Sequence, residues 1–244
     1  CGACLLFVQF ATAQGETPSI ASRSFYGAAT VEFFPEFTAL KHGATLHGAQ
    51  PTDPRYMFMP TTYYVSTSGV GRAVLYEKSA RGGKGVRVGV VGLVTGTLAA
   101  YCDRNDTFVF YEIDTAIKRI ADTYFTYLRR CKGAQVRLGD GRLVLTKELA
   151  TGEKGKYDVI AIDAFSDDTI PVHLLTSQAI ALYGAHLRSS QSIIAVHTSN
   201  RYLNLAPVVM KIGASQGFTA LTIVDMVAAS STARASQWVV MSKD

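Results

Sequence analysis

The stretch V-R-V-G-V-V-G-L-V-T-G-T, residues 86–97, decides the fold of this chain. Its first half, residues 86–91, is largely apolar and has the length of one strand, which is typical of a parallel strand buried on both faces. The strand ends in Gly92-x-x-x-Gly96, where glycines permit a tight turn and let a ligand approach the backbone. A helix is expected from there to about Cys102, and its N-terminus would favour an anion. Strand, glycine turn and helix predict the first unit of an α/β fold.

The chain after this unit continues the alternation of strands and helices. Further strands are expected at residues 108–113, 135–138, 157–163, 193–197, 219–224 and 237–241. The clearest helices between them are expected at residues 116–128, 174–187 and 205–215. This alternation predicts a doubly wound, mostly parallel sheet of seven strands, which makes residues 84–244 one Rossmann-like domain.

Residues 23–83 have a different pattern, with short β-like runs separated by glycine and proline. Strands are expected at residues 30–34 and 39–42, and a helical turn at residues 68–79. A glycine-rich cluster at residues 81–85 is expected to be a hinge. The pattern therefore predicts a small antiparallel β domain in front of the larger one.

Residues 1–22 are expected to be an apolar stub and a linker. Residues 3–13 are almost entirely apolar, and three interpretations stay open: the end of a transmembrane helix whose first part precedes Cys1, the end of a signal peptide, or a buried strand or helix. Residues 14–22 are polar, contain Pro18 and are typical of a linker.

The composition excludes several classes of protein. The chain has 244 residues, 48% of them hydrophobic and 18% charged, which is typical of a globular protein and excludes wholesale disorder. The net charge is +5, but the basic residues are scattered, so we expect no nucleic-acid partner. The four cysteines include one C-x-x-C pair without a second pair or a nearby histidine pair, so we expect no metal site. Their low number fits a reducing compartment.

Acidic residues lie at or just after the ends of three of the expected strands, at the edge where open α/β sheets bind ligands. Glu112, followed by Ile113, lies about 20 residues after Gly92, the spacing at which an acid often binds ribose hydroxyls. Asp140 lies between Gly139 and Gly141, where it could bind an adenine amino group or belong to a plain turn. Asp163 begins an acidic loop and could receive a proton from an attacking amine or hold an ammonium group.

Motifs in this order resemble the spermidine synthase-like family, the polyamine aminopropyltransferases and their homologues. They are G-L-x-T-G-T-L at residues 92–98, Y-E-I-D at 111–114, G-D-G-R at 139–142, Y-D-V-I-x-I-D-A-F-S at 157–166 and I-P-V-H-L-L-T at 170–176. Stretches at residues 22–27, 42–50, 60–64, 68–72 and 197–203 resemble the bacterial branch whose catalytic-like domain often follows a membrane-spanning region. The resemblance covers about residues 22–244 and implies the class I methyltransferase fold.

The resemblance also implies a reaction and its residues. A primary amine or polyamine would attack the methylene beside the sulfonium of decarboxylated S-adenosylmethionine, without a metal, and Asp163 would accept the amine proton. Tyr64, or its neighbour Tyr63, would be the active-site tyrosine, and Gln50 would help to close the site. The nucleoside would be bound by the residues Gly92, Thr95, Gly96, Glu112, Ile113, Asp140, Gly141 and Asp163.

The sequence also departs from the family pattern. Thr95 replaces the aspartate that binds the aminopropyl amine, and Val65 and Ser66 replace a His-Glu pair after the tyrosine. Ser166 replaces the second acid of the aspartate loop. Val94 stands where relatives have glycine, and positive φ there would strain a β-branched residue by roughly 1–3 kcal/mol. Two alternatives therefore stay open: methyl transfer from S-adenosylmethionine, and a non-catalytic nucleoside-binding module attached to a membrane protein.

The resemblance implies a homodimer, and in such enzymes the small β domain is a natural dimer or tetramer contact. It implies a cytoplasmic protein, or one tethered to the cytoplasmic face of the inner membrane through a segment before Cys1. The histidines His173 and His197 lie near strand ends and could face the cleft, and Phe165 could stack on adenine.

Overall fold

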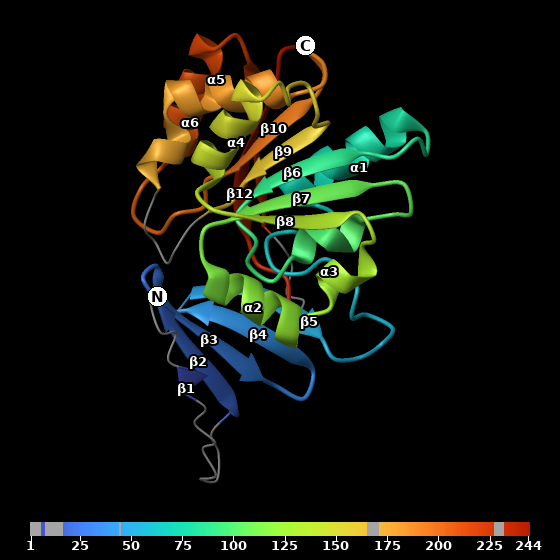
Figure 1. Ribbon diagram of the computed structural model, residues 1–244, viewed down its shortest axis with the longest axis vertical. Helices are drawn as coiled ribbons and strands as arrows, with labels where there is room; N and C mark the ends of the chain where they lie inside the picture. Colours follow the sequence, from blue (N-terminus) through green and yellow to red (C-terminus); the bar gives the residue numbers. More distant parts are fainter. Residues whose placement is uncertain (1–5, 8–16, 44, 165–170, 227–231) are drawn as a thin grey trace.

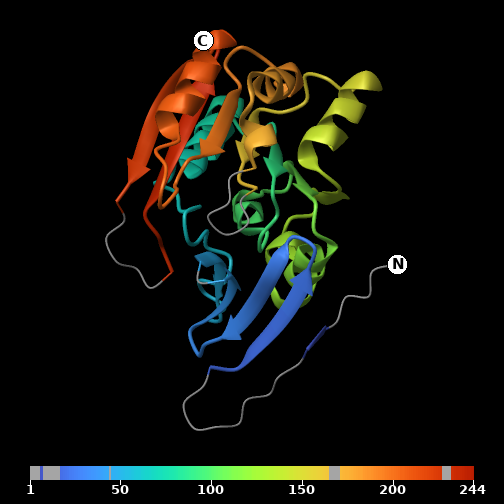
Figure 2. The same ribbon diagram turned by 90° about the vertical axis from the view of Figure 1, so that its left-hand side faces the viewer.

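The computed structural model describes residues 6–7, 17–43, 45–164, 171–226 and 232–244. Two sheets lie one above the other, the smaller built from the N-terminal residues (Figures 1 and 2). The smaller sheet is antiparallel, and its strands follow the order of the sequence. They are β1 (Leu6–Phe7), β2 (Ser19–Ser24), β3 (Gly27–Phe33), β4 (Phe37–His42) and β5 (Thr45–Pro51).

The larger sheet has seven strands in the order β11-β12-β10-β9-β6-β7-β8. They are β6 (Arg87–Val91), β7 (Thr107–Glu112), β8 (Ala134–Leu138), β9 (Val159–Ile162), β10 (Ile193–His197), β11 (Thr219–Asp225) and β12 (Ser236–Ser242). Strands β6 to β10 pair in parallel, and β12 is antiparallel to both of its neighbours. The predicted doubly wound sheet is confirmed, and its strand order reverses at β6, next to the glycine turn.

Helices cover both faces of this sheet (Figure 1). They are α1 (Gly69–Arg81), α2 (Thr115–Tyr124), α3 (Tyr127–Arg130), α4 (Gly141–Ala150), α5 (Ser177–His186) and α6 (Ala206–Ser215), with 3₁₀ turns η1 (Thr97–Tyr101) and η2 (Val172–Leu175). The central strands β6, β9 and β10 are largely apolar and buried, so successive residues enter different cores. Val90 packs in the core with Val74 of α1, whereas Val91 packs in the core with Leu145 of α4.

Two local predictions are wrong in detail. The helix expected at residues 116–128 is broken between α2 and α3, because the Gln50 side chain binds the chain at Thr126 on both its amide oxygen and its amide nitrogen. The linker expected at residues 14–22 is a strand from Ser19 onward, because that segment pairs with β3 across the turn at Phe25. Of the apolar stub, the described Leu6–Phe7 pair with β2 as a strand.

The small sheet contacts the large domain closely at two places. The Ser24 hydroxyl donates to Asp114 across 2.5 Å, which joins β2 to the loop after β7. On β5, a Cβ atom added to Gly48 would lie 2.5 Å from Oγ1 of Thr95, so glycine is needed where β5 crosses the loop after β6. The carboxyl ends of the parallel strands therefore face the small sheet.

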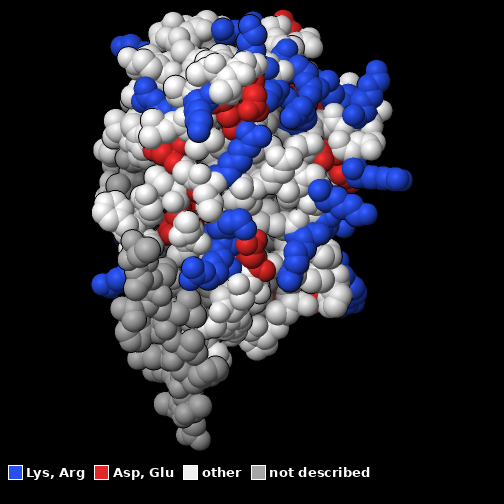
Figure 3. All heavy atoms as spheres, viewed as in Figure 1, with Lys and Arg blue, Asp and Glu red and all other residues white. Residues whose placement is uncertain are grey.

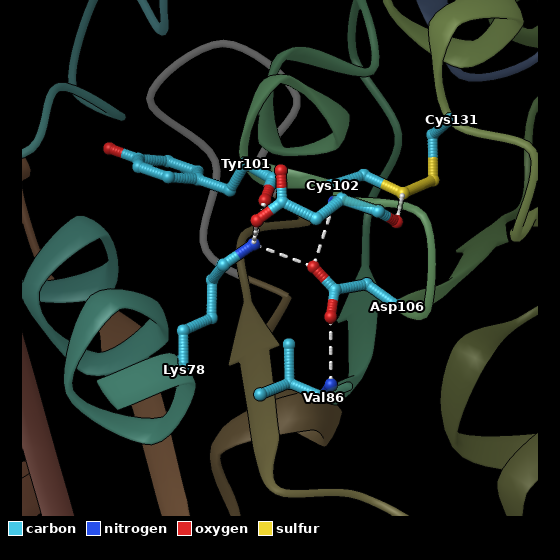
Figure 4. Close-up of a disulfide and its surroundings, with 7 residues drawn as sticks. Lys78, Val86, Tyr101, Cys102, Asp106 and Cys131 are labelled. Atoms are coloured by element: carbon cyan, nitrogen blue, oxygen red, sulfur yellow. Dashed lines mark hydrogen bonds and ion pairs between the residues drawn. A yellow bond between two sulfur atoms is a disulfide. The ribbon is translucent and has the colours of Figure 1, made fainter. Parts of the chain in front are cut away.

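A disulfide joins Cys102, after η1, to Cys131, after α3 (Figure 4). Beside it, the ammonium group of Lys78 from α1 lies 2.6 Å from Asp106 and donates to the Tyr101 carbonyl. The sequence interpretation did not include this bond. The low number of cysteines therefore no longer supports a reducing compartment, because disulfides persist in oxidising compartments.

Charged side chains are dispersed on the face seen in Figure 3, where Lys and Arg are spread over the surface with Asp and Glu between them. Within the described residues, no helix is both long enough and apolar enough to cross a membrane.

Candidate active site

Two cavities meet at Asp163, at the carboxyl end of β9. The smaller has a volume of 220 Å³ and the larger a volume of 840 Å³. Both are lined by Asp163 and by His47 of β5. The carboxylate is buried, with 4% of the residue exposed, so the two cavities meet at a buried carboxylate.

The loops after four adjacent parallel strands form one wall of the smaller cavity, the arrangement expected for a ligand site in an open α/β sheet. The structure thereby brings together six of the residues that the sequence predicts for nucleoside binding. They are Gly92, Glu112, Ile113, Asp140, Gly141 and Asp163. Phe165 and Ser166 lie outside the described residues.

Glu112 organises two of these loops. Its Oε2 accepts from the backbone N–H of Leu93 across 2.9 Å, and its Oε1 accepts from that of Asp114 across 2.8 Å. Burial raises the pKa of the Glu112 carboxyl to about 7, and the two backbone hydrogen bonds oppose that rise.

The glycine turn has three residues with positive φ: Gly92 at 102°, Val94 at 55° and Gly96 at 77°. The positive φ on which the expected strain of Val94 depends is therefore present, and Val94 lines the smaller cavity. A Cβ atom on Gly92 would lie 2.3 Å from the carbonyl oxygen of Asp163, so only glycine fits where β6 passes β9.

Two residues of the predicted nucleoside site lie elsewhere. Thr95 and Gly96, both in the described part of the chain, line neither cavity. The Thr95 hydroxyl lies 2.7 Å from that of Thr97 and is packed against Gly48. Thr95 therefore packs the glycine turn against β5 and does not face either cavity.

Asp140 has a structural role as well as a place in the cavity wall. Its Oδ1 accepts from the backbone N–H of Leu143 across 3.0 Å and so caps α4. Its Oδ2 lies 2.9 Å from Nε2 of His173. His173 also lines the cavity, which agrees with the expectation that this histidine could face the cleft.

Asp163 has a hydrogen-bond partner on each oxygen. The Tyr64 hydroxyl donates to Oδ2, and Nδ1 of His197 lies 2.7 Å from Oδ1. Burial and the charge of Asp163 raise the pKa values of the Tyr63 and Tyr64 hydroxyls well above their ordinary range, so both keep their protons. The structure thus brings Tyr64 and Asp163, both predicted site residues, into direct contact.

Gln50 lies behind the site. Its amide nitrogen donates to the Met57 carbonyl across 2.7 Å, and its other hydrogen bonds hold Thr126. Within the described structure, this side chain lines neither of the two cavities.

Two aromatic rings flank a histidine in the site, and of these three residues only Trp238 goes beyond what the sequence predicts. The His197 imidazole lies between the rings of Tyr63 and Trp238, with centroid distances of 4.6 Å to each. Its place at the end of β10 was a signal in the sequence. The sequence carries no signal for Trp238, because this residue lies inside β12 and not at a strand end.

Among the residues that the structure describes, no three His, Cys, Asp or Glu side chains lie together as a metal site would require. The chemistry of the site is that of a buried carboxylate flanked by a tyrosine and a histidine.

Comparison with known proteins gives both a sequence relative and structural neighbours. No protein-family model matches the chain. A polyamine aminopropyltransferase from Vibrio vulnificus is 33% identical over 87 residues, which is 36% of this chain and 28% of that protein.

The structural neighbours include a spermidine synthase and a probable spermidine synthase. One, in complex with the transition-state analogue AdoDATO, is 13% identical with a TM-score of 0.62, over 92% of this chain and 73% of that one. A probable spermidine synthase from Corynebacterium glutamicum is 14% identical with a TM-score of 0.67, over 91% and 78%.

Human methyltransferase-like protein 13, in complex with SAH, is 20% identical with a TM-score of 0.55, over 71% of this chain and 78% of its own. The neighbours share the methyltransferase-like sheet found here. The resemblance of this chain to the spermidine synthase-like family is confirmed.

Proposed function

We propose that this protein is a transferase that moves an aminopropyl group from decarboxylated S-adenosylmethionine to an amine or polyamine. The observation that carries the proposal is the place of Asp163, on the wall shared by a small cavity and a larger one. A group-transfer enzyme needs its donor and its acceptor on two sides of one reacting centre.

The smaller cavity suits the nucleoside of the donor. Glu112 would accept hydrogen bonds from the ribose hydroxyls, and Asp140 one from the adenine amino group. The close passage of Gly92 past the Asp163 carbonyl keeps that wall free of side-chain bulk. Val94 is the exception, since its side chain takes space in the cavity.

The larger cavity would hold the acceptor. The amine lone pair attacks the methylene carbon beside the sulfonium, a C–N bond forms, and the C–S bond breaks with its electrons passing to sulfur. The products are the extended amine and methylthioadenosine. The amine also loses one proton. The protein would take up this proton at or beside Asp163, whose carboxylate accepts a hydrogen bond from the Tyr64 hydroxyl.

The test is calorimetric titration with decarboxylated S-adenosylmethionine, S-adenosylmethionine and methylthioadenosine, followed by product analysis with putrescine and spermidine as acceptors. Preference for the decarboxylated donor with release of methylthioadenosine supports the proposal. Preference for S-adenosylmethionine with release of S-adenosylhomocysteine would replace it with methyl transfer.

A non-catalytic nucleoside-binding module is the second candidate, and Val94 favours it. A valine with positive φ in the donor cavity costs folding free energy, and catalysis does not require it. Binding of methylthioadenosine without turnover of any donor would support this candidate instead. Binding of none of the three compounds would contradict both.

A further inference from the structure

A row of hydrogen bonds runs from the strand β12 to Asp163. The Gln237 backbone N–H donates to Oγ of Ser199 across 2.8 Å. Oγ of Ser199 lies 2.9 Å from Nε2 of His197, and Nδ1 of His197 lies 2.7 Å from Asp163. This row connects a half-buried hydroxyl on the larger cavity to the buried carboxylate.

The direction of each bond follows from its end groups. A carboxylate only accepts, so Nδ1 of His197 carries the proton that faces Asp163. In the neutral ring Nε2 is then an acceptor, and it takes the hydroxyl proton of Ser199. Ser199 in turn accepts from the Gln237 N–H, which leaves its single proton for the imidazole.

We propose that His197, reached through Ser199, holds the proton that the acceptor loses, and that Asp163 orients and charge-balances the imidazole. This rests on the proposed function and names the residues that act in it. As the amine nitrogen bonds to carbon, its proton passes to Oγ of Ser199 while the hydroxyl proton passes to Nε2 of His197. The acceptor is left neutral, Ser199 is restored, and the imidazolium faces the carboxylate of Asp163.

The burial of the groups favours this route over direct transfer to Asp163. Each oxygen of that carboxylate already accepts a hydrogen bond, and 4% of the residue is exposed. A proton on His197 converts a lone buried anion into a contact ion pair, and a paired buried charge costs less than an unpaired one.

Stacking keeps the imidazole in the orientation that the route needs. The Tyr63 and Trp238 rings lie on either side of it at interplanar angles of 27° and 20°. The electron-rich faces of these rings also favour a cation between them. His197 therefore has one fixed orientation, with Nδ1 toward Asp163 and Nε2 toward Ser199.

The first test needs no substrate. In the full chain labelled with ¹⁵N-histidine, NMR at a pH where the ring is neutral should show the single His197 ring proton on Nδ1, and the His197→Asn variant assigns the signal by its loss. A proton on Nε2 would overturn the route, whatever the protein transfers.

The second test measures turnover with decarboxylated S-adenosylmethionine and the best amine acceptor. Ser199→Ala should lower kcat roughly 100-fold without changing methylthioadenosine affinity, and Ser199→Thr, which keeps the hydroxyl, should recover most of it. Ser190→Ala, at an exposed serine away from the site, is the matched control. A wild-type rate in Ser199→Ala would overturn this route alone, whereas a wild-type protein without turnover would overturn the proposed function.

Discussion

The carboxylate of Glu112 accepts a hydrogen bond from the backbone N–H of Leu93, which ties the end of β7 to the glycine turn after β6. The same side chain holds the N–H of Asp114, at the start of α2. One buried acid thus shapes two loops of the smaller cavity. Glu112 therefore builds the wall of the cavity in which we propose that it binds the ribose.

The first prediction concerns the affinity of that cavity. Glu112→Ala removes the proposed acceptor for the ribose hydroxyls and leaves two backbone N–H groups without their partner, so methylthioadenosine affinity should fall at least about tenfold. Isothermal titration calorimetry measures it. Glu112→Gln, with the same shape, is the control and should bind with intermediate affinity. An unchanged dissociation constant in Glu112→Ala would remove this residue from the site.

The second prediction concerns stability and pH. Burial raises the pKa of the Glu112 carboxyl from 4.5 in its ordinary state to about 7, so between these values the folded protein holds a proton that the unfolded chain has lost. Its contribution to the free energy of unfolding is present below pH 4.5 and decreases as pH rises to 7, by about 3 kcal/mol at most. Urea denaturation at several pH values measures this. Glu112→Gln should lack that part of the pH dependence, and parallel curves would contradict the assignment.

The third prediction concerns Asp163. Asp163→Asn should leave nucleoside affinity unchanged and lower kcat by roughly 100-fold or more. Either orientation of the new amide places its NH₂ group against one of two donors, the Tyr64 hydroxyl or Nδ1 of His197. Tyr64→Phe, which removes one donor and keeps the carboxylate, is the matched comparison and should lose less. Full activity in Asp163→Asn would end its part in proton transfer.

Local patterns were enough to predict the sheet and its ligand edge. The strand expected at residues 193–197 is the observed β10, and the acids Glu112, Asp140 and Asp163 do line the smaller cavity. These predictions succeed because apolar runs and strand ends are properties of neighbouring residues.

Contacts between distant segments were beyond the local patterns, and only the family resemblance placed Tyr64 and Asp163 in one site. Asp163 meets Tyr64 across 99 positions, and Gln50 breaks a helix 76 positions away. No periodicity encodes such pairs, since they depend on where β5 crosses the larger domain. For the same reason the expected roles of Thr95 and Gln50 came from resemblance, whereas their side chains lie behind the cavity walls.

The fourth prediction concerns Val94, whose φ of 55° is in the region that favours glycine. Val94→Gly should be more stable than Val94→Ala by about 1 kcal/mol, because both lose the side-chain packing and only glycine relieves the backbone strain. In an unstrained position the order is reversed. Thermal unfolding of the two variants decides it. Both should also bind methylthioadenosine more tightly than wild type, since the valine side chain takes space in the cavity.

The last prediction concerns the Cys102–Cys131 disulfide, whose cysteines are 29 positions apart. A loop of that size restricts the unfolded chain enough to stabilise the fold by about 3.5 kcal/mol, or about 10 °C in Tm for a chain of this length. Because the bond ties η1, the turn that follows the glycine loop, to α3, its loss should also weaken nucleoside binding. Differential scanning calorimetry of the Cys102→Ala/Cys131→Ala variant measures the first effect and titration the second.

Reduction by dithiothreitol separates the bond from the substitutions. Reductant should lower the Tm of the wild type toward that of the double variant and leave the double variant unchanged. The ion pairs of Lys78 with Asp103 and Asp106 lie beside the disulfide and hold the same loop from the α1 side, so the fold should survive reduction (Figure 4). A wild-type Tm that does not respond to reductant, with both thiols shown by mass spectrometry to be alkylated, would mean that these ion pairs and the core hold the loop without the covalent bond.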